Sequence, residues 1–563
     1  MTAAIRLLII GGYGSFGGRL ARLLADEPRI LLLIGGRSME KARAFCAELG
    51  GGAEPVVFDR DGDVAAGLSA CNPAIAVDAS GPFQTFGPRP YRIAEACIAQ
   101  GISYLDLADG TDFVTGIGTL DAAAREAGVF VLSGVSTLPA LSFAALRHLQ
   151  QGLATVETVT GGIAPSPKVE MGLNVMRAIA GYAGKPVKLL RDSRPATGTA
   201  MVDTFDFTIS PPGALPLARR RFALVDVPDL ALMPQALPGL QSVWFGAGTE
   251  PAILQRLLSL LSRLVKAGLV SSLLPVAGLM HRVGRMLRYG DHRGGMFLKV
   301  AGNDAQGVRH EKCWHLIAEG EHGPFIPAMA SEAILRRCVT GQKPEPGARH
   351  AADALALADF APLFSRLDIV SGVTDVTAEM DQKPLYRRVL GTAFETLPAA
   401  VAALHDHTES HRVSGLAQVE RGASPLARLT AWVVGFPKAG IEIPVSVQFD
   451  INEDREIWTR TFGGKSFAST QAKGTGRNAG LLIETFGPFD IQIALVPLGG
   501  RLQLVIRGWR LFGLRLPRFL APGGTTFEHE ADGRFHFHVE IASPITGLIV
   551  RYRGFLTPDP EPV

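Results

Sequence analysis

The sequence predicts an α/β Rossmann domain with a parallel sheet, then an α/β substrate domain, and finally a mainly antiparallel β domain. Short apolar strands alternate with helical segments over residues 1–135, and a glycine-rich turn follows the first strand. Near the carboxy terminus, apolar residues instead recur at every second position. We therefore place the domains at 1–137, 138–372 and 382–563, with the final helices of the second domain packing back on the first.

The bulk composition is that of a multidomain globular protein. The chain has 563 residues, of which 47% are hydrophobic and 19% charged, so it is too long for one core and apolar enough for several. The net charge is only +3, and no block of Lys and Arg is interleaved with aromatic residues. We therefore expect no nucleic-acid partner.

The cysteines predict buried thiols in a reducing compartment, because none of them forms a C-x-x-C pair or a Cys/His cluster. We expect neither disulfides nor a metal site. The apolar run Ile5–Ile10 ends directly in a glycine turn, which is typical of a buried first strand and not of an export signal. These features predict a cytoplasmic protein. The cysteines are Cys46, Cys71, Cys97, Cys313 and Cys338.

The first domain should consist of strands joined by crossover helices, since this spacing permits only parallel pairing. We expect strands at 5–10, 30–35, 55–58, 74–79, 102–107 and 129–133. We expect helices at 17–26, 38–49, 88–100 and 117–127.

The turn after the first strand has the G-x-G-x-x-G spacing of a dinucleotide-binding loop. The first glycine permits the tight turn, the second lets the backbone approach a pyrophosphate, and the third allows close packing of helix on strand. Exposed amides and the helix dipole then attract the phosphates. The residues expected to bind the cofactor here are Gly12, Gly14, Ser15, Phe16 and Gly17.

The end of the second strand favours NADP over NAD. An NAD site places Asp or Glu there to bind the ribose 2′-hydroxyl, whereas this chain has Arg37 and Ser38. A guanidinium and a hydroxyl can bind a 2′-phosphate that a carboxylate would repel. A second interpretation stays open, in which Ser38 only caps the next helix and Arg37 is solvated.

Two further turns complete the expected cofactor contacts. The small residues Ser80, Gly81 and Pro82 follow the fourth strand, where the chain can pass close to the ribose and phosphates. A plain strand-to-helix loop is the alternative. Asp59, after the third strand, is also included among the cofactor-binding residues.

The segment 252–280 is the most apolar part of the middle region. Arg256, Arg263 and Lys266 interrupt its first half, and the uncharged remainder is about half the length of a membrane span. A buried or interdomain helix pair, a surface lying on a membrane or lipid, and true insertion all stay open. After this region we expect a turn-rich spacer at 343–350 and a helix at 351–359.

The last domain should begin with one helix at 384–407 and continue as antiparallel strands. Apolar residues alternate with polar ones at 441–451, 502–506, 535–541 and 548–555, so each strand presents one apolar face. Ile441, Ile443, Val445, Val447, Phe449 and Ile451 share such a face. We expect a curved sheet or barrel-like half-shell whose interior is either packed core or an apolar pocket.

Six short segments share the pattern of one known family: GGYGSFG at 11–17, DASGPF at 78–83, 96–106, 134–139, YAGKP at 182–186 and GPFIPAM at 323–329. They resemble the saccharopine dehydrogenase (saccharopine reductase)-like family. The resemblance covers about 1–370 and implies an NADP-binding Rossmann domain followed by an α/β substrate domain. From about 382 onward, PLYRRVLG at 384–391 and the β-rich tail are similar to an uncharacterised bacterial domain, which implies architecture only.

No catalytic constellation stands out, so function stays open between two classes. The first is an NADP-dependent oxidoreductase acting on a small or lipid-like molecule, where the protein orients the substrate and moves a proton. The second is a non-catalytic protein that holds the cofactor or binds a ligand or lipid with its β-rich tail. A homodimer and peripheral membrane contact through 252–280 are also open. The catalytic candidates are Tyr104, Asp106, Asp109 and Lys185, with His310, Lys312 and His315 in the middle domain.

Overall fold

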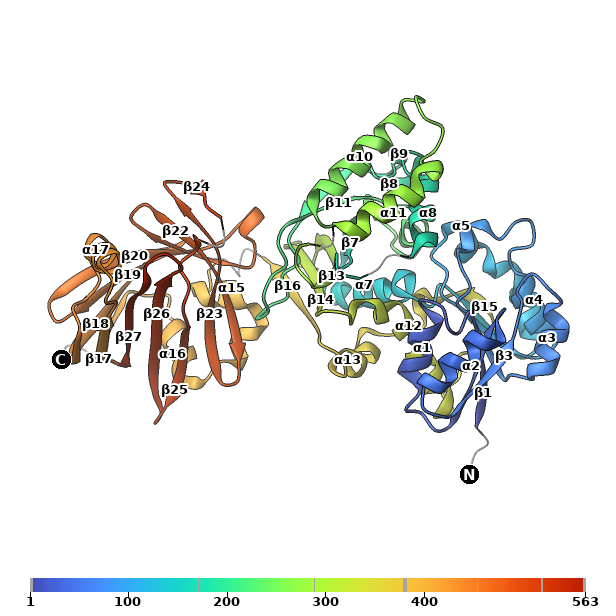
Figure 1. Cartoon of the computed structure of the whole chain (residues 1–563), viewed down its shortest axis with the longest axis horizontal. Helices are drawn as coiled ribbons and strands as arrows, with labels where there is room; N and C mark the ends of the chain where they lie inside the picture. Colours follow the sequence, from blue (N-terminus) through green and yellow to red (C-terminus); the bar gives the residue numbers. More distant parts are fainter. Residues whose placement is uncertain are drawn as a thin grey trace. The chain divides into compact units, whose positions relative to one another are not determined.

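A computed structural model describes residues 4–169, 172–287, 289–377, 382–452, 454–517 and 520–559 (Figure 1). The chain divides into two compact units. The first comprises Met1–Asp206 and Arg220–Val370, and the second comprises Phe207–Arg219 and Ser371–Val563. The predicted fold class is confirmed: a parallel Rossmann-like sheet, a mixed second sheet and an antiparallel β-barrel follow one another.

The first sheet has the strand order β15-β6-β5-β4-β1-β2-β3, and the pairs that define it are parallel. All six predicted strands are present within two residues of the expected bounds. Leu7, Leu8 and Ile9 of β1, which lies between β4 and β2, are fully buried, as both faces are covered by helices. The strands are β1 (Ile5–Ile10), β2 (Ile30–Gly36), β3 (Ala53–Val57), β4 (Ile75–Asp78), β5 (Ser103–Asp106), β6 (Phe130–Ser133) and β15 (Gly347–His350).

The edge strand β15 corrects the prediction of a spacer at 343–350. Its backbone pairs with β6, and Ala348 N donates to the Asp121 carboxylate at 2.8 Å. A four-residue strand with one buried apolar side chain has no periodicity to reveal it. The helix expected at 351–359 begins later, as α13 (Leu357–Ser365).

Helices connect the strands of the first sheet and cover it. The predicted helix 117–127 is instead divided into a 3-10 turn at Ile117–Leu120 and α6, and the short helix α5 precedes it. Arg336 of α12 donates to Leu23 O of α1 at 2.8 Å and pairs with the fully buried Glu332, which holds this helix on the Rossmann sheet. The helices are α1 (Gly17–Leu24), α2 (Met39–Glu48), α3 (Val64–Cys71), α4 (Arg92–Ala99), α5 (Thr111–Gly116), α6 (Asp121–Glu126), α7 (Ser142–Gln150) and α12 (Ile326–Val339).

The second sheet is mixed and has the order β10-β11-β12-β7-β13-β14-β16. Phe222 and Phe297 pack edge to face at 5.1 Å, and a Cβ on Gly162 would lie 2.5 Å from the ring of Phe297 and 2.7 Å from that of Phe222. A Cβ on Gly161 would lie 2.2 Å from the ring of Phe245, so only glycine fits at both positions. The strands are β7 (Thr155–Ala164), β10 (Thr204–Phe207), β11 (Arg220–Leu224), β12 (Ser242–Gly248), β13 (Gly294–Asn303), β14 (Arg309–Ala318) and β16 (Ile369–Val376), and β8 (Pro186–Arg191) and β9 (Arg194–Thr199) form a separate hairpin.

The apolar segment 252–280 forms α10 (Ala252–Lys266) and leads into α11 (Ala277–Met286) (Figure 1). The interpretation as a buried helix pair is wrong, because α10 buries Gln255, Ser259 and Ser262 and leaves Ile253, Leu257 and Leu260 exposed. The alternative of an interdomain helix pair stays a prediction. No helix in the described part of the chain is long and apolar enough to cross a membrane. The remaining helices of this region are α8 (Leu173–Tyr182) and α9 (Asp229–Ala236).

Ten strands of the second unit form a closed antiparallel barrel within the described residues. The predicted half-shell closes because β22 pairs with both β21 and β23. The two-residue β24 (Leu514–Arg515) only extends β23. The barrel strands are β17 (His411–Arg421), β18 (Gly440–Asn452), β19 (Arg455–Phe462), β20 (Lys465–Lys473), β21 (Leu482–Phe486), β22 (Phe489–Leu498), β23 (Arg501–Leu511), β25 (Thr526–Ala531), β26 (Arg534–Ser543) and β27 (Gly547–Pro558).

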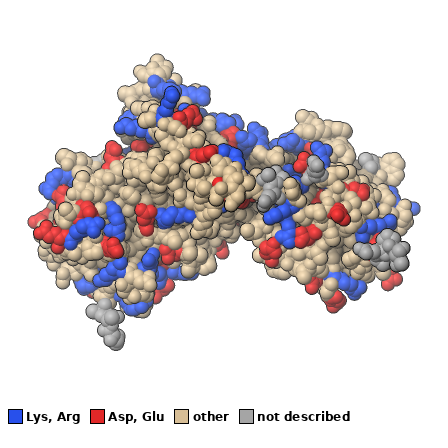
Figure 2. Space-filling model, turned by 180° about the vertical axis from the view of Figure 1, so that it is seen from behind, with Lys and Arg blue, Asp and Glu red and all other residues tan. Residues whose placement is uncertain are grey.

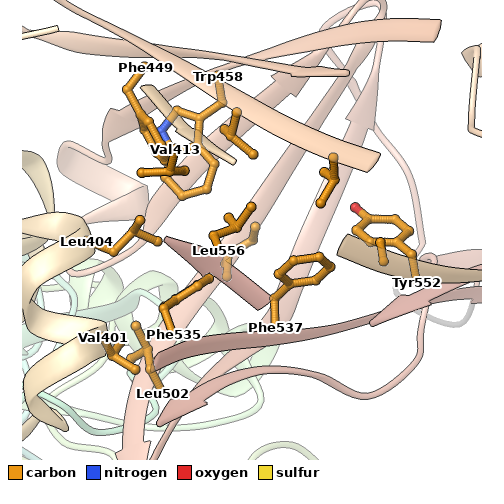
Figure 3. Close-up of a cluster of buried hydrophobic side chains, with 14 of the residues drawn as sticks. Val401, Leu404, Val413, Phe449, Trp458, Leu502, Phe535, Phe537, Tyr552 and Leu556 are labelled. Carbon is orange, nitrogen blue, oxygen red and sulfur yellow. The ribbon is translucent and has the colours of Figure 1, made fainter. Parts of the chain in front are cut away.

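Two local predictions for this domain are wrong. The single helix 384–407 is divided into α15 (Leu385–Leu390), a 3-10 turn and α16 (Ala399–His405), since Gly391 has φ +53° and Pro398 cannot continue a helix. The apolar face of β18 is buried only from Val445 to Phe449, and Ile441 is 79% exposed where the ladder with β17 is irregular. Figure 3 shows the resulting core, to which α16 contributes Val401 and Leu404.

The described surface carries both signs of charge. On the face shown in Figure 2, Lys and Arg are interspersed with Asp and Glu. This agrees with the small net charge of +3.

Candidate cofactor site and active site

The glycine-rich loop has the geometry of a phosphate cradle. Gly11 and Gly12 donate to Gly35 O at 2.9 Å, which ties the loop to β2. A Cβ on Gly17 would lie 2.4 Å from Gly11 O, so this glycine is required for the turn itself. A Cβ on Gly14 would meet only the atoms of Gly11, with Gly11 O at 3.0 Å, so the space in front of it is otherwise open. The loop thus fits a pyrophosphate in front of Gly14.

The first turn of α1 faces this loop without a competing anion. Its cap residue Phe16 makes no side-chain hydrogen bond, and the first turn contains no acidic residue. Ser15 and Phe16 are exposed. Gly14 N and Gly18 N already donate to Gly11 O and Gly14 O, so the amides from Ser15 to Gly17 are the ones available to a phosphate.

At the end of β2, Ser38 caps the next helix and Arg37 is solvated, and binding of a 2′-phosphate by Arg37 stays a prediction. The Ser38 hydroxyl accepts from Lys41 N at 3.3 Å, so it does cap α2. Arg37 is exposed and has no ion pair within the described residues. Tyr13 lies over Gly36, where a Cβ would come within 2.3 Å of its ring, and its hydroxyl accepts from Ser38 N at 3.0 Å. The strand pattern did not reveal this tyrosine, which links the glycine loop to the β2 end.

The remaining expected cofactor residues lie at the same carboxyl edge of the sheet. The buried Asp78 carboxylate accepts from Ser80 N at 2.9 Å and shapes the turn through Gly81 and Pro82. A Cβ on Gly11 would lie 3.0 Å from Ala79 O, so this turn packs directly on the glycine loop. Asp59 is exposed after β3.

Two catalytic candidates, Tyr104 and Asp106, are buried in structural positions. Tyr104 is 1% exposed in the core and hydrogen-bonds Asp78. Asp106 is fully buried, and one of its oxygens accepts from Gly134 N at 2.8 Å, Ala108 N at 3.0 Å and the Ser133 hydroxyl at 3.0 Å. These bonds join the ends of β5 and β6.

Asp106 makes the stability of this domain depend on pH. Burial raises its pKa from 3.8 to about 7. Because the unfolded chain ionises at the lower pKa, this group's contribution to stability is largest below pH ~4 and is lost as the pH rises to ~7. Asp106→Asn keeps the accepting oxygen but does not ionise. The free energy of unfolding of the variant minus that of the wild type should therefore be about 1–3 kcal/mol larger at pH 8 than at pH 5. Denaturant titrations at both pH values measure this, and an unchanged difference would contradict the buried neutral carboxyl.

Unlike Tyr104 and Asp106, Asp109 is not buried in the core but lies in the loop that follows β5. Its side chain is exposed and accepts from Gln84 Nε2 at 2.9 Å, yet the dense protein around it raises its pKa by desolvation. Next to it, the Thr111 hydroxyl donates to Asp226 at 2.8 Å.

Tyr182, the last residue of α8, belongs to the same group. Desolvation raises the pKa of this half-buried phenol, and the charges of Asp109 and Asp226 raise it further. A phenol beside a carboxylate can hold and pass a proton. Sequence reasoning missed Tyr182 as a functional residue, although it stands in the quoted segment YAGKP.

The other sequence candidates lie elsewhere. Lys185 is exposed at the start of the β8–β9 hairpin. His310 pairs with Asp304 at 3.1 Å, and Lys312 donates to Gln151 O at 2.7 Å. His315 is 4% exposed, and burial lowers its pKa to about 3. All five cysteines are buried thiols.

Residues 7–132 of the first domain match the family model described as the saccharopine dehydrogenase NADP binding domain. The first domain is therefore similar to the NADP-binding domains of saccharopine dehydrogenases. The barrel domain matches a second model, described as a domain of unknown function (DUF4166), at residues 397–556. Both parts of the predicted resemblance are therefore confirmed.

The solved structures that match the chain share little of its sequence. Saccharopine dehydrogenase (L-Glu forming) from Saccharomyces cerevisiae has a TM-score of 0.47 and 12% identity, covering 66% of this chain and 100% of its own. Biliverdin reductase from Synechocystis sp. PCC 6803, solved with biliverdin and NADP+, has a TM-score of 0.29 and 15% identity, covering 61% and 92%. A myo-inositol dehydrogenase from Corynebacterium glutamicum ATCC 13032 has a TM-score of 0.32 and 11% identity, covering 65% and 98%. No curated protein matches the chain.

Proposed function

We propose that this protein is an NADP(H)-dependent oxidoreductase acting on a small-molecule carbonyl or alcohol. The observation that carries the proposal is the glycine loop with open space at Gly14, next to a β2 end that carries Arg37 and no carboxylate. The match of this domain to an NADP-binding family supports it.

The residues present suit the cofactor. The amides around Gly14 and at the start of α1 would hold the pyrophosphate, and Arg37 would bind the 2′-phosphate. The turn at Ser80 and Gly81 would lie beside the ribose. When bound, the nicotinamide ring supplies or accepts a hydride.

The residues of the chain itself would orient the substrate and transfer a proton to or from its oxygen. Asp109 and Tyr182 interact electrostatically at the carboxyl edge of the sheet, and Gln84 holds Asp109 in place. In reduction this pair would donate a proton to the substrate oxygen, and in oxidation it would remove one. The raised pKa of Asp109 suits a group that must change protonation.

The direct test is turnover by the purified full chain. NADPH or NADP+ is mixed with small and apolar aldehydes, ketones and alcohols, and the change in nicotinamide absorbance is followed. We expect oxidation of NADPH, or reduction of NADP+, with at least one class. Tight cofactor binding without turnover of any class would instead favour a non-catalytic cofactor-holding protein.

Cofactor choice has its own test at Arg37. Arg37→Glu replaces attraction of the 2′-phosphate by repulsion, so NADPH affinity should fall by about 100-fold while NADH affinity changes little. Titration calorimetry with both cofactors measures this. Arg43→Glu, on an exposed position of neighbouring α2, is the matched control. If the unaltered protein binds NADH more tightly than NADPH, the assignment from the β2 end fails.

A further inference from the structure

The closed barrel of the second unit encloses an apolar cavity. Its volume is about 350 Å³, within the ordinary range for small-molecule sites. A barrel of more than about eight strands is too wide for its inward side chains to fill. Figure 3 shows side chains of several strands projecting into this interior. The lining is mostly aromatic and aliphatic, and includes Phe462, Leu504, Ile506, Phe535, Phe537 and Val539.

The charged groups that line the cavity are already paired. Arg460 binds Glu484 at 3.1 Å and donates to Ser469 at 2.7 Å, and its guanidinium lies 4.8 Å from the ring of Trp458. Glu528 pairs with the buried His405 at 2.7 Å, and Glu540 pairs with Arg551 at 2.7 Å. Among the residues that line the cavity, Arg460 is the one cation beside three glutamates. An anionic head group would therefore find repulsion here and no cation that is not already neutralised.

Helix α17 (Pro425–Val434) lies at the cavity's edge. Thr430 and Val434 line the cavity. On other positions of the helix, Leu426, Leu429 and Trp432 are 55%, 56% and 73% exposed. The Ser424 hydroxyl, at the start of α17, donates to Thr546 O at 2.8 Å, and Thr546 also lines the cavity. An apolar helix surface next to an apolar interior suits the passage of an apolar ligand.

We propose that the barrel binds one uncharged, apolar small molecule, such as a medium-chain alcohol or aldehyde, and discriminates against the corresponding carboxylate. This inference does not depend on the proposed oxidoreductase function.

The test uses the full chain and the uncharged dye Nile red. Dye fluorescence should rise on binding and fall again with 1-dodecanol, while dodecanoate should compete at least tenfold less well. Val539→Trp, which fills the cavity from β26, should weaken dye binding at least tenfold. His538→Trp is the matched control, because successive residues of a strand point to opposite faces. Ile506→Trp repeats the test from β23, and thermal unfolding verifies that each variant is folded.

Three outcomes would overturn the proposal. If dodecanoate competes with the dye as well as 1-dodecanol does, the barrel does not discriminate against anions. Equal dye binding by the folded Val539→Trp and Ile506→Trp variants places the dye outside the barrel. Failure of the unaltered chain to bind Nile red or dodecanol means that the cavity is packing space only.

A second, independent observation concerns the surface formed by α10 and α11. Gln255, Ser259 and Ser262 of α10 are at most 8% exposed, whereas Ile253, Leu257 and Leu260 are 58%, 47% and 55% exposed. Neither amide atom of Gln255 nor the Ser259 hydroxyl has a hydrogen-bond partner among the described residues. The helix is therefore amphipathic in the reverse sense to an ordinary surface helix. Leu269 and Leu279, which follow it, are 74% and 62% exposed.

The charges of this segment indicate what kind of partner the surface of α10 and α11 contacts. No Asp or Glu occurs between Glu250 and Asp291 in the sequence, whereas Arg256, Arg263 and Lys266 lie exposed on α10 and Arg282 on α11. Exposed leucines interleaved with cations are typical of helices that lie in the head-group region of an anionic bilayer. We infer that α10 and α11 dock this protein on an anionic membrane surface.

Vesicle flotation tests this inference. The full chain should float with phosphatidylcholine vesicles that contain phosphatidylglycerol, much less with pure phosphatidylcholine, and less as salt rises. Leu257→Ser/Leu260→Ser and Arg256→Glu/Arg263→Glu should each reduce the floated fraction at least fivefold. Leu498→Ser, which alters an exposed leucine of the barrel, is the control. No flotation, or equal flotation of the variants, would overturn the inference. So would a dimer in light scattering that the leucine variant abolishes, since the occupant is then a second copy.

Discussion

Gly14→Val is expected to abolish NADPH binding while the fold is retained. A Cβ at this position would meet only Gly11, with Gly11 O at 3.0 Å, so the backbone needs to shift by a few tenths of an ångström. The rest of the valine side chain would fill the open space in front of the loop, where the pyrophosphate approaches the backbone. Calorimetric titration with NADPH measures the loss, and circular dichroism and the unfolding midpoint verify the fold.

Two other glycines provide the controls for Gly14→Val. Gly118→Val adds the same side chain to the same domain where a Cβ meets nothing within 4 Å, so NADPH binding should be unchanged. Gly17→Val should instead lower the unfolding midpoint, because its Cβ would lie 2.4 Å from Gly11 O. A folded Gly14→Val protein that still binds NADPH would place the cofactor away from this loop.

Asp109→Asn is expected to lower turnover by about 10²–10⁴-fold, the usual contribution of a general acid or base. The asparagine oxygen can still accept from Gln84, which donates to Asp109 at 2.9 Å, so the geometry is kept while the proton is lost. In the oxidation direction the ionised carboxylate is needed. The rate should therefore rise with pH through a pKa above the ordinary value for Asp, and Asp109→Asn should remove that rise.

The control for Asp109→Asn is Asp112→Asn, an exposed carboxylate on the adjoining α5. It should leave both turnover and the pH profile unchanged. Tyr182→Phe removes the phenol next to Asp109 and should lower turnover about tenfold or more without altering NADPH affinity. Wild-type rates and an unaltered pH profile in Asp109→Asn would remove this carboxyl from the mechanism.

The sequence was sufficient for features that depend on near neighbours along the chain. The strands from β1 to β6 are apolar runs bounded by turns, and the glycine loop is a local steric pattern. The match of residues 7–132 to an NADP-binding family agrees with that local pattern. Period-two alternation likewise predicted the antiparallel strands of the last domain.

Other features depend on residues that are distant in the chain. The pairing of β22 with β23 closes the barrel, and no periodicity within a strand shows whether a curved sheet will close. Strand β15 exists because β6 offers it an edge, and one buried alanine in four residues carries no pattern of its own. The break of the predicted helix at 384–407 had local signals in Gly391 and Pro398, which the apolar pattern around them obscured.

Two features depend entirely on the tertiary structure. They are the exposure of Leu257 and Leu260 on α10 and the electrostatic interaction of Asp109 with Tyr182. The helical period shows which residues of α10 share a face, but it does not show which face packs against the rest of the protein. In the structure, the polar face of α10 is the buried one. Asp109 and Tyr182 lie 73 positions apart in the sequence, on a loop after β5 and at the end of α8. The sequence by itself determined the strands, the glycine loop and the type of cofactor domain, because these follow from local sterics and alternation. Only the tertiary structure decided which faces were buried and which polar groups met, because both depend on what packs against each element.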